Sequence, residues 1–194
     1  MLQYLFDESE FLWPYGIRAL SAAHRDKPCV LHACNGELRA EYSPAESTTS
    51  VFGGNSNWRG PVWFPVNYLL VEALQRYHYF YGDSLTVEVP IGSGRRMNLA
   101  QAASEVAHRL IQLFLPDCYG QRPCHGGQEK YATDPHWRDL ILFSEYFHGD
   151  NGRGCGASHQ TGWTALVVRL LQKFGSARPT TLAKPAKAAL AGKI

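Results

Sequence analysis

The chain has 194 residues, of which 45% are hydrophobic and 19% charged, and its formal net charge is +2. This length suffices for a domain with a substantial core, and a charge so close to neutrality gives no indication of a nucleic-acid partner or an acidic membrane surface. No apolar run is long enough to span a bilayer, so we expect no membrane partner either.

The N-terminal segment combines acidic and apolar residues with residues that favour turns. Tyr4 to Ser21 contains Pro14 and Gly16, which predicts the end of a helix followed by a turn. The residues after Met1 lack the basic and apolar regions of a signal peptide. Residues 22–60 are rich in Gly, Pro, Ser, Asn and Thr, which predicts a long loop with one short hairpin around Asn35-Gly36.

Cysteine usage indicates the compartment and argues against a metal. The chain has five cysteines with no regular spacing. An odd, irregular set favours free thiols in a reducing cytoplasm over a disulfide framework. Cys118 and Cys124, the latter followed by His125, fit no common zinc spacing, so we expect no metal and no cofactor.

Two helices are expected in the middle of the chain. The first runs from Pro61 to Tyr81, with Gly82 as its C-cap, and the second begins after the N-cap Asn98 and ends before Pro116. The apolar stripe expected to face the core consists of Leu69, Leu70, Ala73, Leu74, Tyr77 and Phe80 in the first helix, and of Leu99, Ala102, Val106, Leu110, Leu113 and Phe114 in the second.

The C-terminal third alternates between polar loops and short apolar runs. After a polar loop over 117–133, Pro135 to about Leu140 is predicted to form one or two helical turns, and residues 140–143 to be buried and extended. A Gly-rich loop over 148–162 precedes a last helix that opens at Thr161 or Gly162. Its expected inward residues are Trp163, Leu166, Val167, Leu170, Leu171 and Phe174.

Residues 1–174 are expected to form the domain, and 175–194, rich in Ala, Lys and Pro, a disordered tail. Three moderate helices joined by long loops make a thin core. We therefore expect a mainly α chain that forms part of a larger helical domain.

Three clusters of residues could carry chemistry. The first, Gly53 to Tyr68, places Trp58, Arg59 and Trp63 at the entry to a helix, where free N–H groups, stacking area and a fork of donors coincide. These groups suit binding of a sugar. Composition alone allows equally that the two tryptophans are core residues and that Arg59 forms a structural ion pair.

The second cluster, Asp134 to Gly152, contains a carboxylate in an apolar setting. Glu145 follows four apolar residues closely and precedes Tyr146, so full solvation is not expected. A general base for hydrolysis has to be ionised yet shielded enough to hold one water. The alternative from the pattern alone is an ion pair of Glu145 with Arg138 or Arg153.

The third cluster, Gly154 to Thr164, places His159 and Gln160 at a helix start beside Trp163. The small residues around them would let a ligand or another loop approach closely. A hydrogen-bonded structural role is the usual one for such a histidine. No Ser-His-Asp or Cys-His arrangement and no phosphate-binding loop can be argued from the spacing.

In this order, the clusters resemble glycoside hydrolase family 63 and the related mannosylglycerate-hydrolase-like enzymes. Residues 58–63, Trp-Arg-Gly-Pro-Val-Trp, resemble the family's Trp-Arg-Gly-Pro-x-Trp signature. A second run resembles the family's terminal signature. It consists of Glu145-Tyr146, Gly149, Gly152 and residues 160–165, Gln-Thr-Gly-Trp-Thr-Ala. The resemblance extends to about Phe174.

The resemblance implies an (α/α)6 toroid and hydrolysis of an α-glycosidic bond with inversion. Such hydrolysis uses an acid and a base about 6.5–9.5 Å apart. Glu145 matches the base, and the positions that match substrate-binding residues are Trp58, Arg59, Trp63, Trp137, Gln160 and Trp163. The substrate would be an oligosaccharide or a small glycoside. Glucose, mannose and mannosylglycerate substrates all remain open.

The family's general acid, an Asp in a preceding part of the toroid, has no match in this chain. We therefore expect the C-terminal part of an (α/α)6 glycosidase, nearly inactive alone, whose partner would be the missing N-terminal part of the same enzyme. The alternatives are a carbohydrate-binding module that has lost catalysis and a non-functional remnant.

Overall fold

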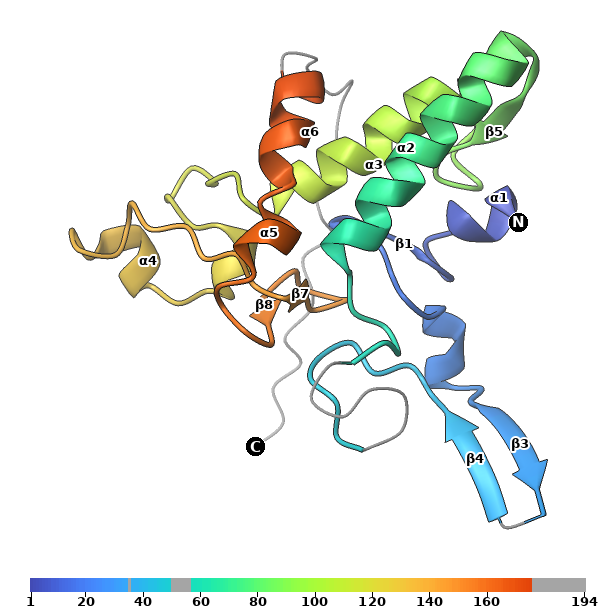
Figure 1. The fold of residues 1–194 in the computed structure, drawn as a ribbon, viewed down its shortest axis with the longest axis horizontal. Helices are drawn as coiled ribbons and strands as arrows, with labels where there is room; N and C mark the ends of the chain where they lie inside the picture. Colours follow the sequence, from blue (N-terminus) through green and yellow to red (C-terminus); the bar gives the residue numbers. More distant parts are fainter. Residues whose placement is uncertain (35, 50–56, 176–194) are drawn as a thin grey trace.

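The computed structural model describes residues 1–34, 36–49 and 57–175. The expected disordered tail, apart from Gly175, lies outside the described residues, as do Asn35 and the first residues of the Gly53 to Tyr68 cluster. Within the described ranges the fold is mainly helical. Two long helices lie side by side at its centre, and small two-stranded sheets surround them (Figure 1).

Short helices and hairpins flank the two long helices along the chain. The helices are α1 (Leu2–Leu5), α2 (Phe64–Tyr81), α3 (Leu99–Gln112), α4 (Lys130–Thr133), α5 (Thr161–Thr164) and α6 (Val167–Phe174), with 3-10 turns at Ala22–Arg25, Gly82–Ser84 and Pro123–His125. The strands pair as antiparallel hairpins: β1 (Leu12–Trp13) with β2 (Gly16–Ile17), β3 (Cys29–Ala33) with β4 (Gly36–Ala40), β5 (Thr86–Glu88) with β6 (Arg96–Asn98), and β7 (Tyr146–Phe147) with β8 (Gly154–Cys155).

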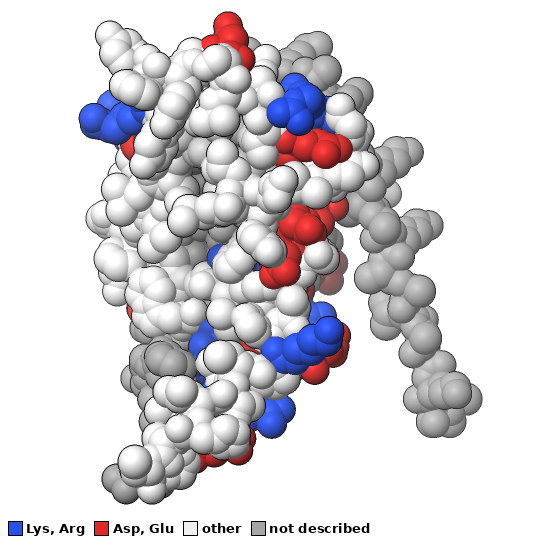
Figure 2. Space-filling view, turned by 90° about the vertical axis from the view of Figure 1, so that its right-hand side faces the viewer, with Lys and Arg blue, Asp and Glu red and all other residues white. Residues whose placement is uncertain are grey.

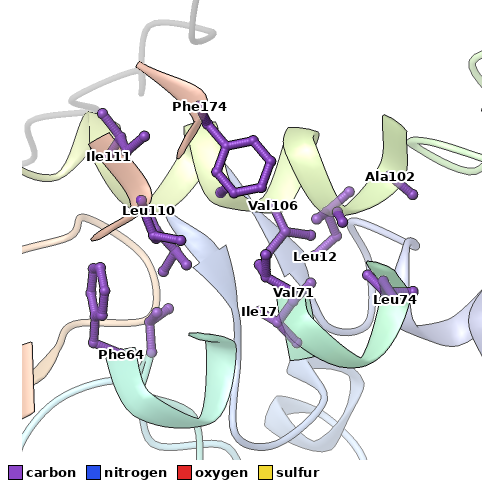
Figure 3. Close-up of a cluster of buried hydrophobic side chains, with 14 of the residues drawn as sticks. Leu12, Ile17, Phe64, Val71, Leu74, Ala102, Val106, Leu110, Ile111 and Phe174 are labelled. Carbon is purple, nitrogen blue, oxygen red and sulfur yellow. The ribbon is translucent and has the colours of Figure 1, made fainter. Parts of the chain in front are cut away.

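The core lies between α2 and α3. Side chains of α2, such as Val71, face Val106 and Leu110 of α3, while Phe174 of α6 and Ile17 of β2 close the cluster (Figure 3). Burying each large aliphatic side chain contributes about 1.5–3 kcal/mol relative to leaving it exposed. The N-terminal hairpin and the last helix are therefore held on the same two-helix core.

The sequence prediction for α3 is confirmed. All six residues of its expected stripe are buried, and Asn98 is the N-cap. The Asn98 side chain accepts a hydrogen bond from the Gln101 N–H, and the Gln101 side chain accepts one from the Asn98 N–H, which together form a capping box. The hairpin expected around Asn35-Gly36 is also present as β3–β4.

The predicted stripe of α2 is confirmed only in part: Leu74 is buried and Leu70 packs against the core, whereas three other members are exposed. Leu69, Tyr77 and Phe80 are 67%, 59% and 80% exposed. The buried positions of this helix are Phe64, Asn67, Val71 and Leu74. The reason is the polar residue Asn67, whose amide donates to the Ile17 and Trp63 carbonyl oxygens and whose oxygen accepts from the Ile17 N–H.

Because Asn67 satisfies backbone groups of the N-terminal hairpin, its side of α2 turns inward although a polar residue lies in the middle of it. A stripe predicted from the apolar residues alone is therefore rotated about the helix axis relative to the face that is buried.

Two further predictions need correction. Pro135 to Leu140 forms turns without helix, and the preceding loop contains α4. Leu140 and Ile141 are 47% and 37% exposed, which contradicts the buried run expected over 140–143. The aromatic rings of Tyr131 and Trp137 pack on each other, so this segment is held by its own aromatic contacts.

The last helix is split. α5 ends at Thr164 and α6 begins at Val167, where Val167, Leu170 and Phe174 are buried as expected. Trp163 and Leu171 are instead about a third exposed. None of the helices among the described residues is both long and apolar enough to cross a membrane.

The core packing leads to a stability prediction. Leu110→Ala removes a completely buried side chain, and we expect it to lower the free energy of unfolding by about 2–5 kcal/mol. Leu69→Ala is the matched control on the exposed side of α2 and should change it by no more than about 0.5 kcal/mol. Urea unfolding of both variants measures the difference. Equal losses would show that α2 buries the other face.

Candidate active site

Three distant segments meet at Val62. Its N–H donates to the Phe147 carbonyl at 2.8 Å and its carbonyl accepts from the Phe147 N–H at 2.9 Å, while Val62 also pairs with Arg18. The strand-like contacts thus join the N-terminal hairpin, the segment that precedes α2, and β7. The residues resembling the two family signatures are brought together by this backbone pairing.

The guanidinium of Arg18 lies buried at the centre of this junction. It donates to the carbonyl oxygens of Glu8, Glu10, Leu12 and Gly149. It also lies 3.7 Å from the Asp150 carboxylate and 4.2 Å from the centre of the Trp13 ring. Burial lowers the pKa of Arg18, and Tyr42 and Asp150 oppose that shift. A buried cation with this many partners fixes the chain around it.

Asp150 gathers donors from the other side of the junction. Its carboxylate accepts from the Tyr42 hydroxyl and from Arg25, each at 2.7 Å, and its carbonyl accepts from the Trp13 indole at 2.8 Å. Burial and the bond to Asp150 raise the pKa of Tyr42. The turn over 148–152 is therefore held in place from several sides.

Two glycines let this turn approach the segment before α2. A β-carbon on Gly149 would lie 2.5 Å from both the Gly60 carbonyl oxygen and the Tyr42 hydroxyl. Gly60 itself has φ +149°, and a β-carbon there would lie 2.7 Å from the Tyr42 ring. Only glycine fits this approach of two backbones, which explains the glycine at each position.

Next to this junction lies a group of stacked aromatic rings. The indoles of Trp58 and Trp63 are parallel, with centroids 3.8 Å apart, and Tyr146 stacks on Trp63 at 4.7 Å. Trp163 meets Trp63 edge-on at 6.1 Å. Trp63 is buried and donates to the Asn57 carbonyl, whereas Trp58 is 42% exposed. The aromatic group thus combines a fixed base with an indole open to solvent.

Glu145 lies beside this aromatic group. Its N–H donates to the Ala157 carbonyl at 2.8 Å, and its Oε2 accepts from the Ala157 N–H at 3.2 Å. A β-carbon on Gly156, which has φ +68°, would lie 2.6 Å from Oε2. The half-buried carboxylate is therefore held against the backbone of the Gly-rich loop.

Electrostatics link Glu145 to the stacked rings. The pKa of Tyr146 is raised to about 12, first by burial and then by its electrostatic interactions with Cys155, Glu46 and Glu145. The carboxylate of Glu145 thus acts on a ring that itself stacks on Trp63. The sequence offered Arg138 and Arg153 as ion-pair partners of Glu145. In the structure Arg153 pairs with Glu46 at 3.0 Å and Arg138 with Asp139 at 3.7 Å.

Arg59 is buried beneath this surface. Its Nη2 donates to the Ser47 hydroxyl at 3.1 Å, and its N–H donates to the Asn57 side chain. Its Nε has no hydrogen-bond partner within the described ranges. Arg59 therefore supports the segment that carries Trp58 and keeps one buried donor uncommitted.

The two remaining predicted residues differ in position. Gln160 is exposed and is the N-cap of α5, three residues before Trp163. Trp137 belongs to a second aromatic group, in which it packs on Tyr131 and lies 4.2 Å from the Lys130 ammonium. The structure thus brings together Glu145, Trp58, Trp63 and Trp163, and it places Trp137 in a group of its own.

The residues that hold this site together have no signature in the sequence. Arg18, Tyr42 and Asp150 meet across more than a hundred residues of chain, and so do Glu46 and Arg153. The hydrogen bond from Arg153 lowers the pKa of Glu46. No local pattern reveals such pairs. Tyr146 could have been predicted as a site residue, because it directly follows the candidate base Glu145 in the sequence.

Comparison with known proteins indicates a distant relation to glycosidases. No family model matches the chain. The chain is 31% identical over 124 residues to the mannosyl-oligosaccharide glucosidase of Saccharomyces cerevisiae, covering 63% of the chain and 12% of that protein. It is 25% identical over 174 residues to a probable mannosyl-oligosaccharide glucosidase of Schizosaccharomyces pombe, covering 89% of the chain and 15% of that protein. The chain is thus a distant homologue of glycosidases.

A nearer relative is an uncharacterized protein of Saccharomyces cerevisiae, which is 50% identical over 177 residues. That match covers 90% of the chain but 16% of the yeast protein. The chain therefore spans less than a fifth of the length of the curated relatives that it matches.

The close approach of two backbones at Gly149 can be tested directly. Gly149→Ala should lower the free energy of unfolding by about 1–3 kcal/mol, because the new methyl group meets a carbonyl oxygen and a bonded hydroxyl. Gly162→Ala is the control, since nothing lies within 4 Å of a β-carbon there. Thermal unfolding compares them, and an unchanged midpoint for Gly149→Ala would show that the two segments lie further apart.

A second prediction concerns the stability of the fold at low pH. His148 Nδ1 accepts from the Asp150 N–H at 3.0 Å, so the ring has to be unprotonated at that atom. Burial lowers the pKa of His148 below its ordinary value of about 6.5. The folded state then binds a proton less readily than the unfolded chain, so this contribution to stability is complete above about pH 6.5 and is lost as the pH falls.

His148→Asn keeps an acceptor for the Asp150 N–H but cannot titrate. Its thermal midpoint should fall less than that of the wild type between pH 7.5 and pH 5.5. The exposed His136, changed to Asn, serves as the control and should behave as the wild type does. Identical acid sensitivity of His148→Asn and the wild type would contradict the assignment.

Proposed function

We propose that the chain contributes the base side of the active site of an inverting α-glycosidase, with Glu145 as the general base. The observation that carries this proposal is a half-buried carboxylate beside stacked indoles, in a chain that is homologous to mannosyl-oligosaccharide glucosidases. In such a reaction the base takes a proton from a water molecule, which attacks the anomeric carbon from the face opposite the leaving oxygen.

The setting of Glu145 suits this role. The Ala157 N–H fixes the direction of the carboxylate, and Tyr146 lies close enough for the charge of Glu145 to raise its pKa. A general base must lie within hydrogen-bond reach of the proton it takes, so a fixed orientation removes part of the entropic cost of the reaction.

The aromatic group suits the substrate. We propose that the exposed face of Trp58 packs against the apolar face of a pyranose, while Trp63 holds Trp58 flat and Trp163 lines the edge. Gln160 would bind a sugar hydroxyl, and Arg59 would provide its uncommitted donor from beneath. Trp137, in its separate group, would contact only a longer oligosaccharide.

The general acid would come from outside this chain. We propose that the remainder of an (α/α)6 toroid supplies it, either in the same polypeptide or as a partner. Two observations support this. The relatives are several times longer than the chain, and α2 exposes Leu69, Tyr77 and Phe80 on one side. Apolar side chains gathered on one helix face are usually covered by a neighbouring element.

The cysteines bear on the compartment. The five thiols are free, and burial raises the pKa of Cys124 and Cys155 to about 12, so these two are poor nucleophiles. Free thiols support the proposal that the protein works in the reducing cytoplasm.

One observation favours a second candidate function. All the rings of the aromatic group belong to this chain, whereas none of its residues is assigned as the general acid that would act with Glu145. A carbohydrate-binding chain without catalysis, or a remnant of an enzyme, would look the same at this site. The two candidates differ in whether Glu145 is needed for turnover.

The test replaces the matched segment of the 50%-identical yeast protein with this chain. We expect the chimera to hydrolyse p-nitrophenyl α-glucoside or an α-linked disaccharide, with the β-anomer released first. Glu145→Gln should lower kcat by about 10²–10⁴-fold, as expected for loss of a general base, without changing the folded state seen by circular dichroism.

Glu129→Gln, at an exposed carboxylate, is the matched control and should retain full turnover. Turnover by Glu145→Gln above a few per cent would remove Glu145 from the role of base. A folded chimera that binds sugar but hydrolyses none of these substrates would favour the binding function and contradict the catalytic one.

A further inference from the structure

A groove of about 950 Å³ lies apart from the aromatic group and Glu145. Five parts of the chain line it: the N-terminal segment with Tyr15, the β5–β6 connection with Arg95, α3 with Gln112, the segment that follows α3 with Arg122, and the turn over 148–152 with Asn151. None of the residues around Trp63 contributes to it. Its volume is at the upper end of the range for ligand sites, about 300–1,000 Å³.

The floor of the groove is a chain of alternating charges. Arg109, whose side chain is 7% exposed, lies 3.0 Å from Glu105 and 3.6 Å from Glu8, and Arg95 lies 3.9 Å from Glu105. Each of these charges has a partner of opposite sign within the floor. The floor is thus fixed in shape and electrically satisfied, so it neither needs nor attracts an ion.

The charges that line the groove balance. The acidic residues are Glu8, Glu105 and Asp117, and the basic residues are Arg95, Arg109 and Arg122. On the side of the molecule seen in Figure 2, acidic and basic side chains are likewise interspersed. A site with balanced charge has no long-range preference for an anion or a cation, which favours an uncharged ligand.

The residues that line the groove include three whose polar side-chain groups have no hydrogen-bond partner within the described ranges. These groups are the Tyr15 hydroxyl and the side-chain amides of Gln112 and Gln121. Arg122 commits its Nε to the Phe114 carbonyl, and the ends of its guanidinium make no hydrogen bond within the same ranges. Pro14, Pro116 and Leu115 provide apolar surface between them.

We propose that this groove binds a neutral, polyhydroxylated ligand, a segment of a carbohydrate chain, at a second site separate from Glu145. Amides and a phenol both donate and accept, as sugar hydroxyls do, and the proline and leucine side chains fit the C–H faces of the rings. The proposal stands on the groove itself and does not depend on a catalytic role of Glu145.

The test is calorimetric titration of the full chain with maltotriose and with mannotriose. We expect saturable binding of at least one of them, weakened about tenfold or more by Tyr15→Phe and by Gln121→Ala, as expected when a hydrogen bond to a bound hydroxyl is lost. Leu69→Ala, an exposed substitution on α2 that lies outside the groove, should leave this binding unchanged.

Two results would overturn the proposal. One is binding that Trp58→Ala abolishes and that Tyr15→Phe and Gln121→Ala leave intact, or no saturable binding at all. The other is tighter binding of trigalacturonic acid than of the neutral trisaccharides, which would show that the groove selects an anion. Gln121 is exposed, so its substitution leaves the core untouched and decides the matter should Tyr15→Phe alter folding.

Discussion

The ion pair of the buried Arg18 with the partly exposed Asp150 is the constraint on which the candidate site depends. Arg18 binds four carbonyl oxygens from two regions of the chain, and Asp150 binds Tyr42 and Arg25. Removing Asp150 would destabilise the fold, because the buried charge of Arg18 would lose its carboxylate partner. The pair therefore contributes more to the position of the turn over 148–152 than to net stability. A well-packed apolar pair could contribute as much to the free energy of unfolding, but without hydrogen bonds it would not orient the turn.

This constraint reaches Glu145 through the backbone. The turn that Asp150 fixes connects β7 to β8, and β7 begins at the residue after Glu145. Val62 pairs with β7 on one side, and the adjoining Trp63 stacks on Tyr146. The carboxylate and the indoles are thus held by the same short hairpin, so that they keep their relation while Trp58 remains open to solvent. An exposed binding surface on a rigid support loses little entropy when it binds a ligand.

How much of this the sequence predicts depends on the range of each interaction. α3 was predictable, because its cap and its apolar stripe are local patterns, and the hairpin β3–β4 follows from a local turn signal. The inner face of α2 was not, because Asn67 is buried through bonds to Ile17, fifty residues away. The aromatic group was half predictable: Trp58 and Trp63 share one segment, but Tyr146 and Trp163 join them only through the Val62 pairing and the packing of α5. The junction around Arg18 left no trace in any local window.

The burial of α2 and α3 shows which faces of these two helices are covered by other parts of the chain. α3 is buried over six consecutive residues, 106–111, which covers every side of a helix, so it needs no further neighbour. α2 buries only the face with Asn67 and Val71 and exposes Leu69, Tyr77 and Phe80 on another side. α2 is therefore the edge of this helical layer, and an additional helix would extend the layer there. Because Trp63 directly precedes α2, such a helix would also bring new residues to the end of the layer at which the aromatic group lies. If Glu145 is the base, as proposed above, the general acid would approach its carboxylate from the side of α2.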